Sequence, residues 1–208
     1  SGLARLGAGT SGQVLKTGGS GANPSWGTLS SDYVKLASGT IGNVASVSID
    51  GYYTSDYDVY KIFLFDVRND TANRQLYWRF NQGGSALTAS NYRFVAKGNY
   101  TQSNQSANDT QTQAWGADKG YSAWDLSTGA DRGSQVEMTI FNPLGTTNEK
   151  FWQIAYTIDV QDANYITSMT GGGYYNDGGA SAHSGVTFFP QSNNFNTGGK
   201  WKLYGIKA

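Results

Sequence analysis

The stretch from residue 184 to residue 207 predicts two β-strands separated by a polar loop, and it constrains the fold more than any other part of the sequence. Val186 and Phe188 occupy alternate positions, which is the period of a strand with one buried face. Residues 200–206 alternate in the same way, and the segment 191–199 between the two strands is rich in asparagine and glycine. A strand this close to the last residue must pair with strands from far upstream. We therefore expect it to complete a β-sandwich.

Short alternating segments continue through most of the chain. Residues 33–36 and 41–49 predict a first pair of strands, and residues 60–67 are apolar on both faces, as in a central strand. Residues 136–140 and 152–160 predict a hairpin around a turn at residues 142–145. Further strands are expected at residues 76–80, 92–97 and 165–169, giving nine to eleven short strands in all.

The composition supports the same fold class. Aromatic residues make up 14% of the 208 residues, with 28 glycines and only 3 prolines, and no helical period extends beyond two turns. Bulky strand residues separated by many turns are typical of all-β proteins. We expect an antiparallel β-sandwich, jelly-roll-like in its strand order, over residues 31–208.

The N-terminal segment, residues 1–30, is rich in glycine, serine and threonine. Such a segment cannot bury enough surface to fold alone, and a flexible linker is one interpretation. Val14, Leu15 and Trp26 do not suit a pure linker, because exposed apolar side chains lower solubility. The other interpretation is an extended neck in which identical chains cover these three side chains.

The polar run at residues 99–112 predicts a long surface loop, the kind of segment that carries recognition on a rigid scaffold. Aromatic residues also occur in predicted loops rich in glycine, serine and asparagine. There, flat apolar faces beside amide groups can stack on a sugar ring and bond its hydroxyls. Packing within the domain, or a subunit interface, is the alternative role for these aromatics. The candidate ligand-binding residues are Trp115, Tyr121, Trp124, Tyr174, Tyr175, Asn176 and His183.

Catalytic signals are weak. His183 is the only histidine, and no Gly-x-Ser-x-Gly nucleophile elbow occurs, so it is interpreted either as an ordinary loop histidine or as a ligand contact. Glu137 and Glu149 are the only glutamates, and the aspartates fall in turn-like segments, although two loop carboxylates could meet in space as in a hydrolase. Residues 56–58 and 176–177 suit turns more than calcium ligation. We expect no enzyme activity, no metal site and no cofactor.

Charge and cysteine content exclude other classes. Lysine plus arginine and aspartate plus glutamate number 15 each, so no net field favours nucleic acid or an anionic membrane. Cysteine is absent, which excludes disulfides and thiolate metal sites. No apolar run approaches the length of a membrane helix. We expect a soluble chain that begins partway through a longer polypeptide.

Two motifs resemble phage proteins. Residues 9–17, GTSGQVLKT, followed by residues 21–26, GANPSW, closely resemble a connector element of phage and prophage fibre proteins. The C-terminal region resembles the C-terminal signature of phage tail-fibre and related virion-fibre β-domains, and the unit at residues 57–83 resembles another part of the same domain. Phe189-Pro190 departs from that pattern. The matching C-terminal residues are Val186, Phe188, Asn194, Phe195, Gly198, Leu203, Tyr204, Gly205, Ile206 and Lys207.

The resemblance implies a virion structural protein on the particle surface. It implies a trimeric neck and a distal domain that attaches to a host-surface glycan or protein, with the chain itself and other virion proteins as partners. A capsid decoration or head-fibre protein without receptor binding is the alternative, and a polysaccharide hydrolase is a third possibility. The sequence indicates neither nucleic-acid binding nor membrane insertion.

Overall fold

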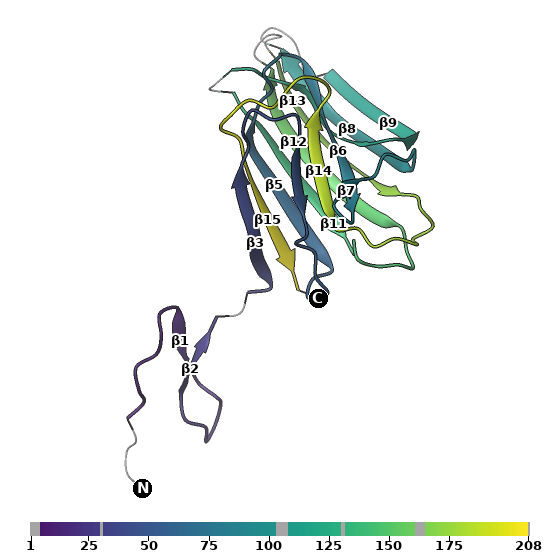
Figure 1. Cartoon of the computed structure of the whole chain (residues 1–208). Coiled ribbons are helices and arrows are strands. Elements are labelled where there is room, and N and C mark those ends of the chain that lie inside the picture. Colours follow the sequence, from purple (N-terminus) through teal and green to yellow (C-terminus); the bar gives the residue numbers. More distant parts are fainter. Residues whose placement is uncertain (1–4, 30, 103–107, 130–131, 161–164, 208) are drawn as a thin grey trace. The chain divides into compact units, whose positions relative to one another are not determined.

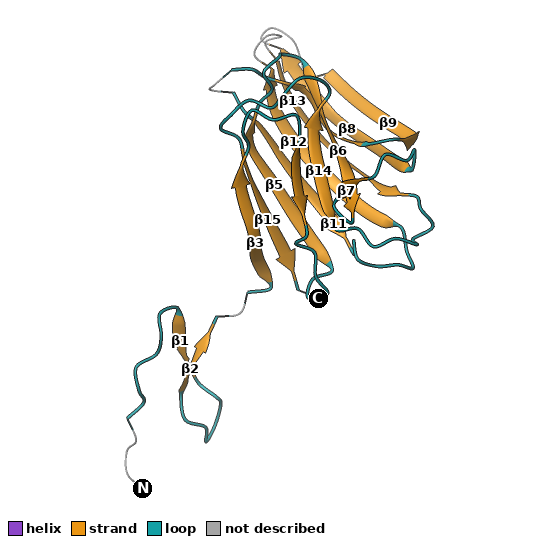
Figure 2. Cartoon of the chain, in the orientation of Figure 1, coloured by secondary structure: helices purple, strands orange, loops and turns teal. Residues whose placement is uncertain are grey.

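The computed structural model describes residues 5–29, 31–102, 108–129, 132–160 and 165–207. The chain divides into two compact units, Ser1–Asp32 and Tyr33–Ala208. All regular structure among the described residues is β-strand (Figure 2), so they include no helix able to cross a membrane. The expectation of an all-β protein is confirmed.

The first unit contains one antiparallel hairpin. Strand β1 (Gln13–Lys16) pairs with β2 (Ser25–Thr28), and Leu15 lies opposite Trp26. The indole N–H of Trp26 donates a hydrogen bond to the carbonyl oxygen of Gly7 at 2.6 Å. The segment is thus folded locally as a hairpin.

The second unit contains two antiparallel sheets (Figure 1). The five-stranded sheet has the order β10 (Gly120–Leu126), β6 (Arg74–Gln82), β14 (Gly185–Pro190) and β4 (Val47–Asp50), with the short β7 (Ser85–Ala86) also paired to β6. The eight-stranded sheet has the order β3 (Tyr33–Thr40), β15 (Lys200–Ile206), β5 (Val59–Val67), β11 (Ser134–Phe141), β12 (Lys150–Val160), β13 (Tyr165–Tyr175), β8 (Tyr92–Gln102) and β9 (Asn108–Ala117).

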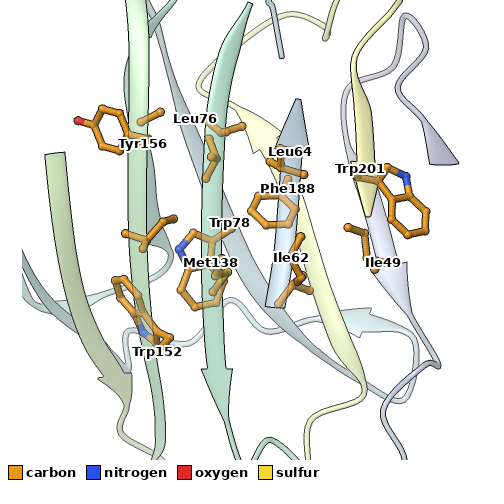
Figure 3. Close-up of a cluster of buried hydrophobic side chains, with 14 of the residues drawn as sticks. Ile49, Ile62, Leu64, Leu76, Trp78, Met138, Trp152, Tyr156, Phe188 and Trp201 are labelled. Atoms are coloured by element: carbon orange, nitrogen blue, oxygen red, sulfur yellow. The ribbon is translucent and has the colours of Figure 1, made fainter. Parts of the chain in front are cut away.

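The two sheets pack face to face through a layer of large apolar side chains (Figure 3). Trp78 of β6 and Trp152 of β12 meet edge to face with ring centroids 5.0 Å apart, a geometry that aromatic quadrupoles favour. Phe188 of β14 and Leu64 of β5 belong to the same core and are at most 1% exposed. This packing confirms the expected β-sandwich.

Several predicted elements are confirmed. Strand β15 pairs with β3 on one side and β5 on the other, so the last strand does join distant parts of the chain. Strands β11 and β12 form the predicted hairpin, and Gly145 N donates a hydrogen bond to Asn142 O at 3.2 Å in its turn. Strand β5 lies inside the eight-stranded sheet, between β15 and β11. The expectation that both its faces are covered is wrong, because Phe63 and Phe65 on the outer face are only half-buried.

Three other predictions about strands are wrong. Residues 33–36 and 41–49 do not pair with each other, because β3 pairs with β15 and β4 with β14, in different sheets. The predicted loop at residues 99–112 is largely strand: β8 runs to Gln102 and β9 starts at Asn108, with 103–107 outside the described residues. Polar residues form strands here because main-chain bonds between β8 and β9 supply the pairing. The fifteen strands described also exceed the nine to eleven expected.

The glycine run at residues 171–173 lies inside β13, which extends well beyond the predicted strand at residues 165–169. Both neighbouring strands approach it closely. A Cβ placed on Gly173 would lie 2.1 Å from the carbonyl oxygen of Arg93 on β8, well inside van der Waals contact. Glycine is therefore needed here for close strand packing rather than for a turn.

Candidate functional site

The candidate site lies on the outer face of the eight-stranded sheet, the face turned away from the core. Strand register places four side chains in one row across this face: Trp115 of β9 opposite Arg93 of β8, Arg93 opposite Tyr174 of β13, and Tyr174 opposite Phe151 of β12. Directly opposite residues of antiparallel strands lie on the same side of a sheet. We call these four side chains the aromatic row.

The aromatic row is exposed but held in place by its own contacts. Trp115 is 78% exposed, and the guanidinium carbon of Arg93 lies 4.4 Å from its ring centroid. Arg93 Nη1 also donates a hydrogen bond to the hydroxyl of Tyr174 at 2.9 Å, and the rings of Tyr174 and Phe151 are 5.5 Å apart. Cation–π and ring contacts of this kind orient flat side chains without burying them. The row offers a flat, partly apolar surface with donors at its edge.

A hollow of about 560 Å³ lies beside the aromatic row. It is lined by Arg93, Trp115 and Tyr174 together with Val95, which is 60% exposed. Its floor includes Gly172, whose position on this face carries no side chain. The missing side chain at Gly172 keeps the hollow open between its aromatic walls.

Two further hollows continue from the first across the sheet. The second, of about 540 Å³, shares Val95 and Gly172 with the first, and the third, of about 280 Å³, shares Ala155, Glu137 and Thr170 with the second. The third ends at Phe63 and Phe65 of β5. Because adjacent hollows share residues, they form one continuous depression, which we call the outer trough.

Charged side chains lie along the outer trough. The Nζ of Lys61 donates to the carboxylate of Glu137, which lines the trough. Exposed Lys97 also lines it. The trough thus combines apolar rings and charged groups in an open channel, an arrangement suited to binding an extended polar ligand and lacking an enclosed reaction chamber.

Of the residues predicted from sequence, Trp115 and Tyr174 belong to this site. Both lie in strands, so their assignment to loops was wrong, because the pairing of β9 and β13 could not be seen in the local sequence. Asn176 follows β13, is half-buried, and donates its backbone N–H to Asn91 O at 2.9 Å. The side chain of Trp124, in β10, lies outside the described residues.

Three other predicted site residues lie in the core and away from the candidate site. Tyr121 of β10 is 7% exposed, Tyr175 of β13 is 3% exposed and His183 is fully buried. Burial raises the pKa of the Tyr121 and Tyr175 hydroxyls above the usual tyrosine value. The expectation that these residues contact a ligand from surface loops is wrong, because the sandwich encloses them.

His183 sits between aromatic rings of both sheets. Its ring centroid lies 4.4 Å from that of Phe80 and 5.2 Å from that of Tyr175, and its Nε2 is 3.7 Å from Asp177 Oδ2. Burial lowers the pKa of His183 to about 4, and the charge of buried Lys150 adds to this, while Asp177 opposes it. At neutral pH the imidazole is therefore neutral.

The described residues hold no group of three or more histidine, cysteine, aspartate or glutamate side chains that could bind a metal ion. In the first unit, Leu15 is 55% and Trp26 39% exposed, and Val14 is half-buried. Their role in an oligomeric neck stays a prediction.

Sequence reasoning missed Arg93, Val95, Phe151 and Gly172. A signal was present for two of them, because Arg93 and Val95 alternate with apolar Tyr92 and Phe94 in a predicted strand and so had to face outward. Only the strand order places Arg93 and Val95 beside Trp115 and Phe151.

The chain matches no family model, no curated protein and no solved structure.

Proposed function

We propose that this chain is the distal part of a virion fibre or spike, and that its β-sandwich attaches the particle to a carbohydrate of the host surface. The observation that carries the proposal is the aromatic row beside the Gly172 hollow. Tryptophan that is 78% exposed in a contiguous apolar patch is unusual unless it binds something. Sugar rings fit such a site, because one face of a pyranose is apolar and its edge carries hydroxyls that amide and guanidinium groups can bond.

The proposed ligand surface belongs to the sheet rather than to loops. Main-chain pairing positions these strand-borne side chains, with β8 and β13 paired on both sides and the edge strand β9 paired with β8, so Trp115, Arg93 and Tyr174 keep a fixed spacing. A rigid surface loses little conformational entropy on binding. A rigid surface of this kind suits weak, repeated contacts with a polymeric ligand. Several copies on one particle would then raise the overall affinity through multivalency.

The test compares Trp115→Ala with the wild-type chain in binding to host cells and to an array of bacterial polysaccharides. A central tryptophan contact typically contributes about 2 kcal/mol, so affinity should fall by roughly 30-fold. Tyr52→Ala is a matched control, because Tyr52 is 41% exposed and lies in the loop before β5. Equal binding by Trp115→Ala and wild type would contradict the proposed site. Saturable binding to capsids with none to host cells would instead favour the decoration or head-fibre alternative.

The first unit is proposed to be the neck through which three copies associate. For the second unit, the proposal classes the β-sandwich as jelly-roll-like. A two-stranded hairpin is at best marginally stable alone, and Leu15 and Trp26 leave apolar surface on it. Identical copies that cover these side chains would stabilise it. Light scattering should give about three times the 22.4 kDa chain mass, and Leu15→Ser with Trp26→Ser should shift the mass towards one chain. A wild-type monomer at micromolar concentration would refute the neck.

A further inference from the structure

We propose that the outer trough binds an extended anionic polysaccharide, which lies across the strands from the aromatic row to the lysines of β15. This inference rests on the proposed carbohydrate-binding function and adds the charge class and the path of the ligand.

The first argument is the length and shape of the trough. It crosses β9, β8, β13, β12, β11 and β5, and neighbouring strands are about 4.8 Å apart, so it spans roughly 24 Å. Its floor carries Gly172, Ala155 and Thr170, which keep the channel passable along its length. A single sugar would fill only one hollow. A chain of several sugar units uses all three and can leave the sheet at either end.

The second argument is the distribution of charge. The whole chain is neutral, with 15 basic and 15 acidic residues, but cations outnumber acids along the trough: Arg93 and Lys97 line it, and three more lysines lie beyond its β5 end. Lys200 and Lys202 of β15 lie opposite Phe65 and Phe63, the residues that end the trough, and exposed Lys35 of β3 lies opposite Tyr204.

No acidic side chain in the described part of the chain forms an ion pair with Lys35, Lys200 or Lys202. Lys202 Nζ lies 5.5 Å from the Phe65 ring centroid, over the end of the trough. Glu137, the one acidic side chain among the described residues that line the trough, is already paired with Lys61. A neutral glycan would leave this cationic rim unused, whereas carboxylates or phosphates spaced along a polymer complement it.

A polysaccharide fits this surface better than single-stranded nucleic acid. Nucleic-acid channels combine stacking rings with a basic groove that follows the whole backbone. Here the carboxylate of Glu137 lies in the middle of the path and interrupts the basic groove that a nucleic-acid backbone needs. Nucleic acid is therefore treated as a competing outcome of the test.

The experiment measures binding of the full chain to polygalacturonate, alginate and hyaluronate, and to the carboxyl-reduced derivative of each. A glycerol-phosphate teichoic acid distinguishes phosphate from carboxylate recognition, dextran is the neutral reference, and a thymidine 20-mer is the nucleic-acid probe. We expect at least one anionic polymer to bind about tenfold or more tightly than its uncharged counterpart or dextran. This preference should weaken as salt is raised.

Variants link the preference to the trough. Removing two surface charge contacts with Lys200→Gln and Lys202→Gln together should weaken anionic binding by roughly tenfold and leave neutral binding unchanged. Ala155→Gln, which raises a side chain from the trough floor, should weaken binding of long polymers more than of disaccharides. Lys16→Gln, a lysine of the first unit, is the control and should bind like the wild type. Thermal unfolding of each variant verifies that it is folded.

Each outcome has one meaning. Equal binding of charged and carboxyl-reduced polymers overturns the anionic preference and leaves the attachment function standing. Binding to host cells with none to any anionic polymer also overturns the inference alone. Tighter binding to the thymidine 20-mer than to every polysaccharide overturns both. A last outcome combines two results: the wild type binds no polysaccharide, and Trp115→Ala loses self-association. It would identify the face as an interface between copies and overturn the inference.

Discussion

Replacing His183 with phenylalanine should flatten the dependence of the stability of the second unit on pH. His183 is fully buried between Phe80 and Tyr175. Because burial disfavours the charged imidazole, the pKa of His183 falls from 6.5 to about 4 in the folded state. Phenylalanine has a similar flat shape and cannot be protonated.

Proton linkage gives the sign and size of the pH effect on the free energy of unfolding. Between pH 6.5 and pH 4 the unfolded chain binds a proton at His183 that the folded chain does not, so the free energy of unfolding falls as pH falls. The stabilisation is fully present above pH 6.5, and its loss is complete just below the folded pKa of about 4. A difference of 2.5 between 6.5 and 4, at 1.36 kcal/mol per unit, gives about 3 kcal/mol.

Two charged groups face the imidazole and act in opposite directions. Asp177, with Oδ2 at 3.7 Å from Nε2, favours the protonated form, whereas buried Lys150 disfavours it. Asp177→Asn should therefore lower the pKa of His183 further. That variant extends the test to the electrostatic cause, because it leaves the burial of His183 intact.

The assay is urea unfolding followed by tryptophan fluorescence at several values between pH 7 and pH 4. Thr146→Ala, exposed in the turn before β12, is the control and should keep the wild-type slope. Since His183 is the only histidine, its Cε1 proton also gives the pKa directly by NMR. A titration midpoint near 6.5, or an unchanged slope in the variant, would refute the buried neutral histidine. His183→Gln replaces the phenylalanine variant if that one does not fold.

Three further predictions concern stability. Leu203→Ala, at a fully buried position of the last strand, should lower the free energy of unfolding by about 3 kcal/mol in urea unfolding; a loss below 1 kcal/mol would argue against its place in the core. Gly120→Ala should destabilise by about 2 kcal/mol or more, because the new Cβ would lie 2.2 Å from the Trp78 ring, and near-UV circular dichroism should report the disturbed tryptophan; an unchanged spectrum and stability would contradict this contact. Lys61→Gln breaks a partly exposed ion pair with Glu137, so its melting curve should shift by the equivalent of at most about 1 kcal/mol, and a larger loss would show that the pair is more than a surface contact.

The candidate site could be predicted only in part. Trp115 and Tyr174 were chosen from sequence as ring-stacking residues, and both lie in the aromatic row. Tyr121 and Tyr175 were predicted on the same grounds and are buried. A glycine- and serine-rich neighbourhood therefore does not distinguish an exposed ring from a core ring, because burial depends on what the opposite sheet places over it.

The local sequence determined the fold class and many of the strands. Alternation at residues 136–140 and 152–160 identified strands and their buried faces, because the period of a strand is set within a few residues. Residues 60–67 identified a strand but not its buried face, since both faces are apolar. It also identified the last strand as one that pairs far upstream.

Only the tertiary structure decided which strand pairs with which, and hence where the trough lies. Strand β3 pairs with β15 rather than with the nearby β4, and the residues at the two ends of the trough, Phe63 and Trp115, are far apart in the sequence. Pairing between distant strands is selected by the packing of the whole core, which alternation within one segment does not encode. The site is a product of strand order, and strand order is a property of the complete sandwich.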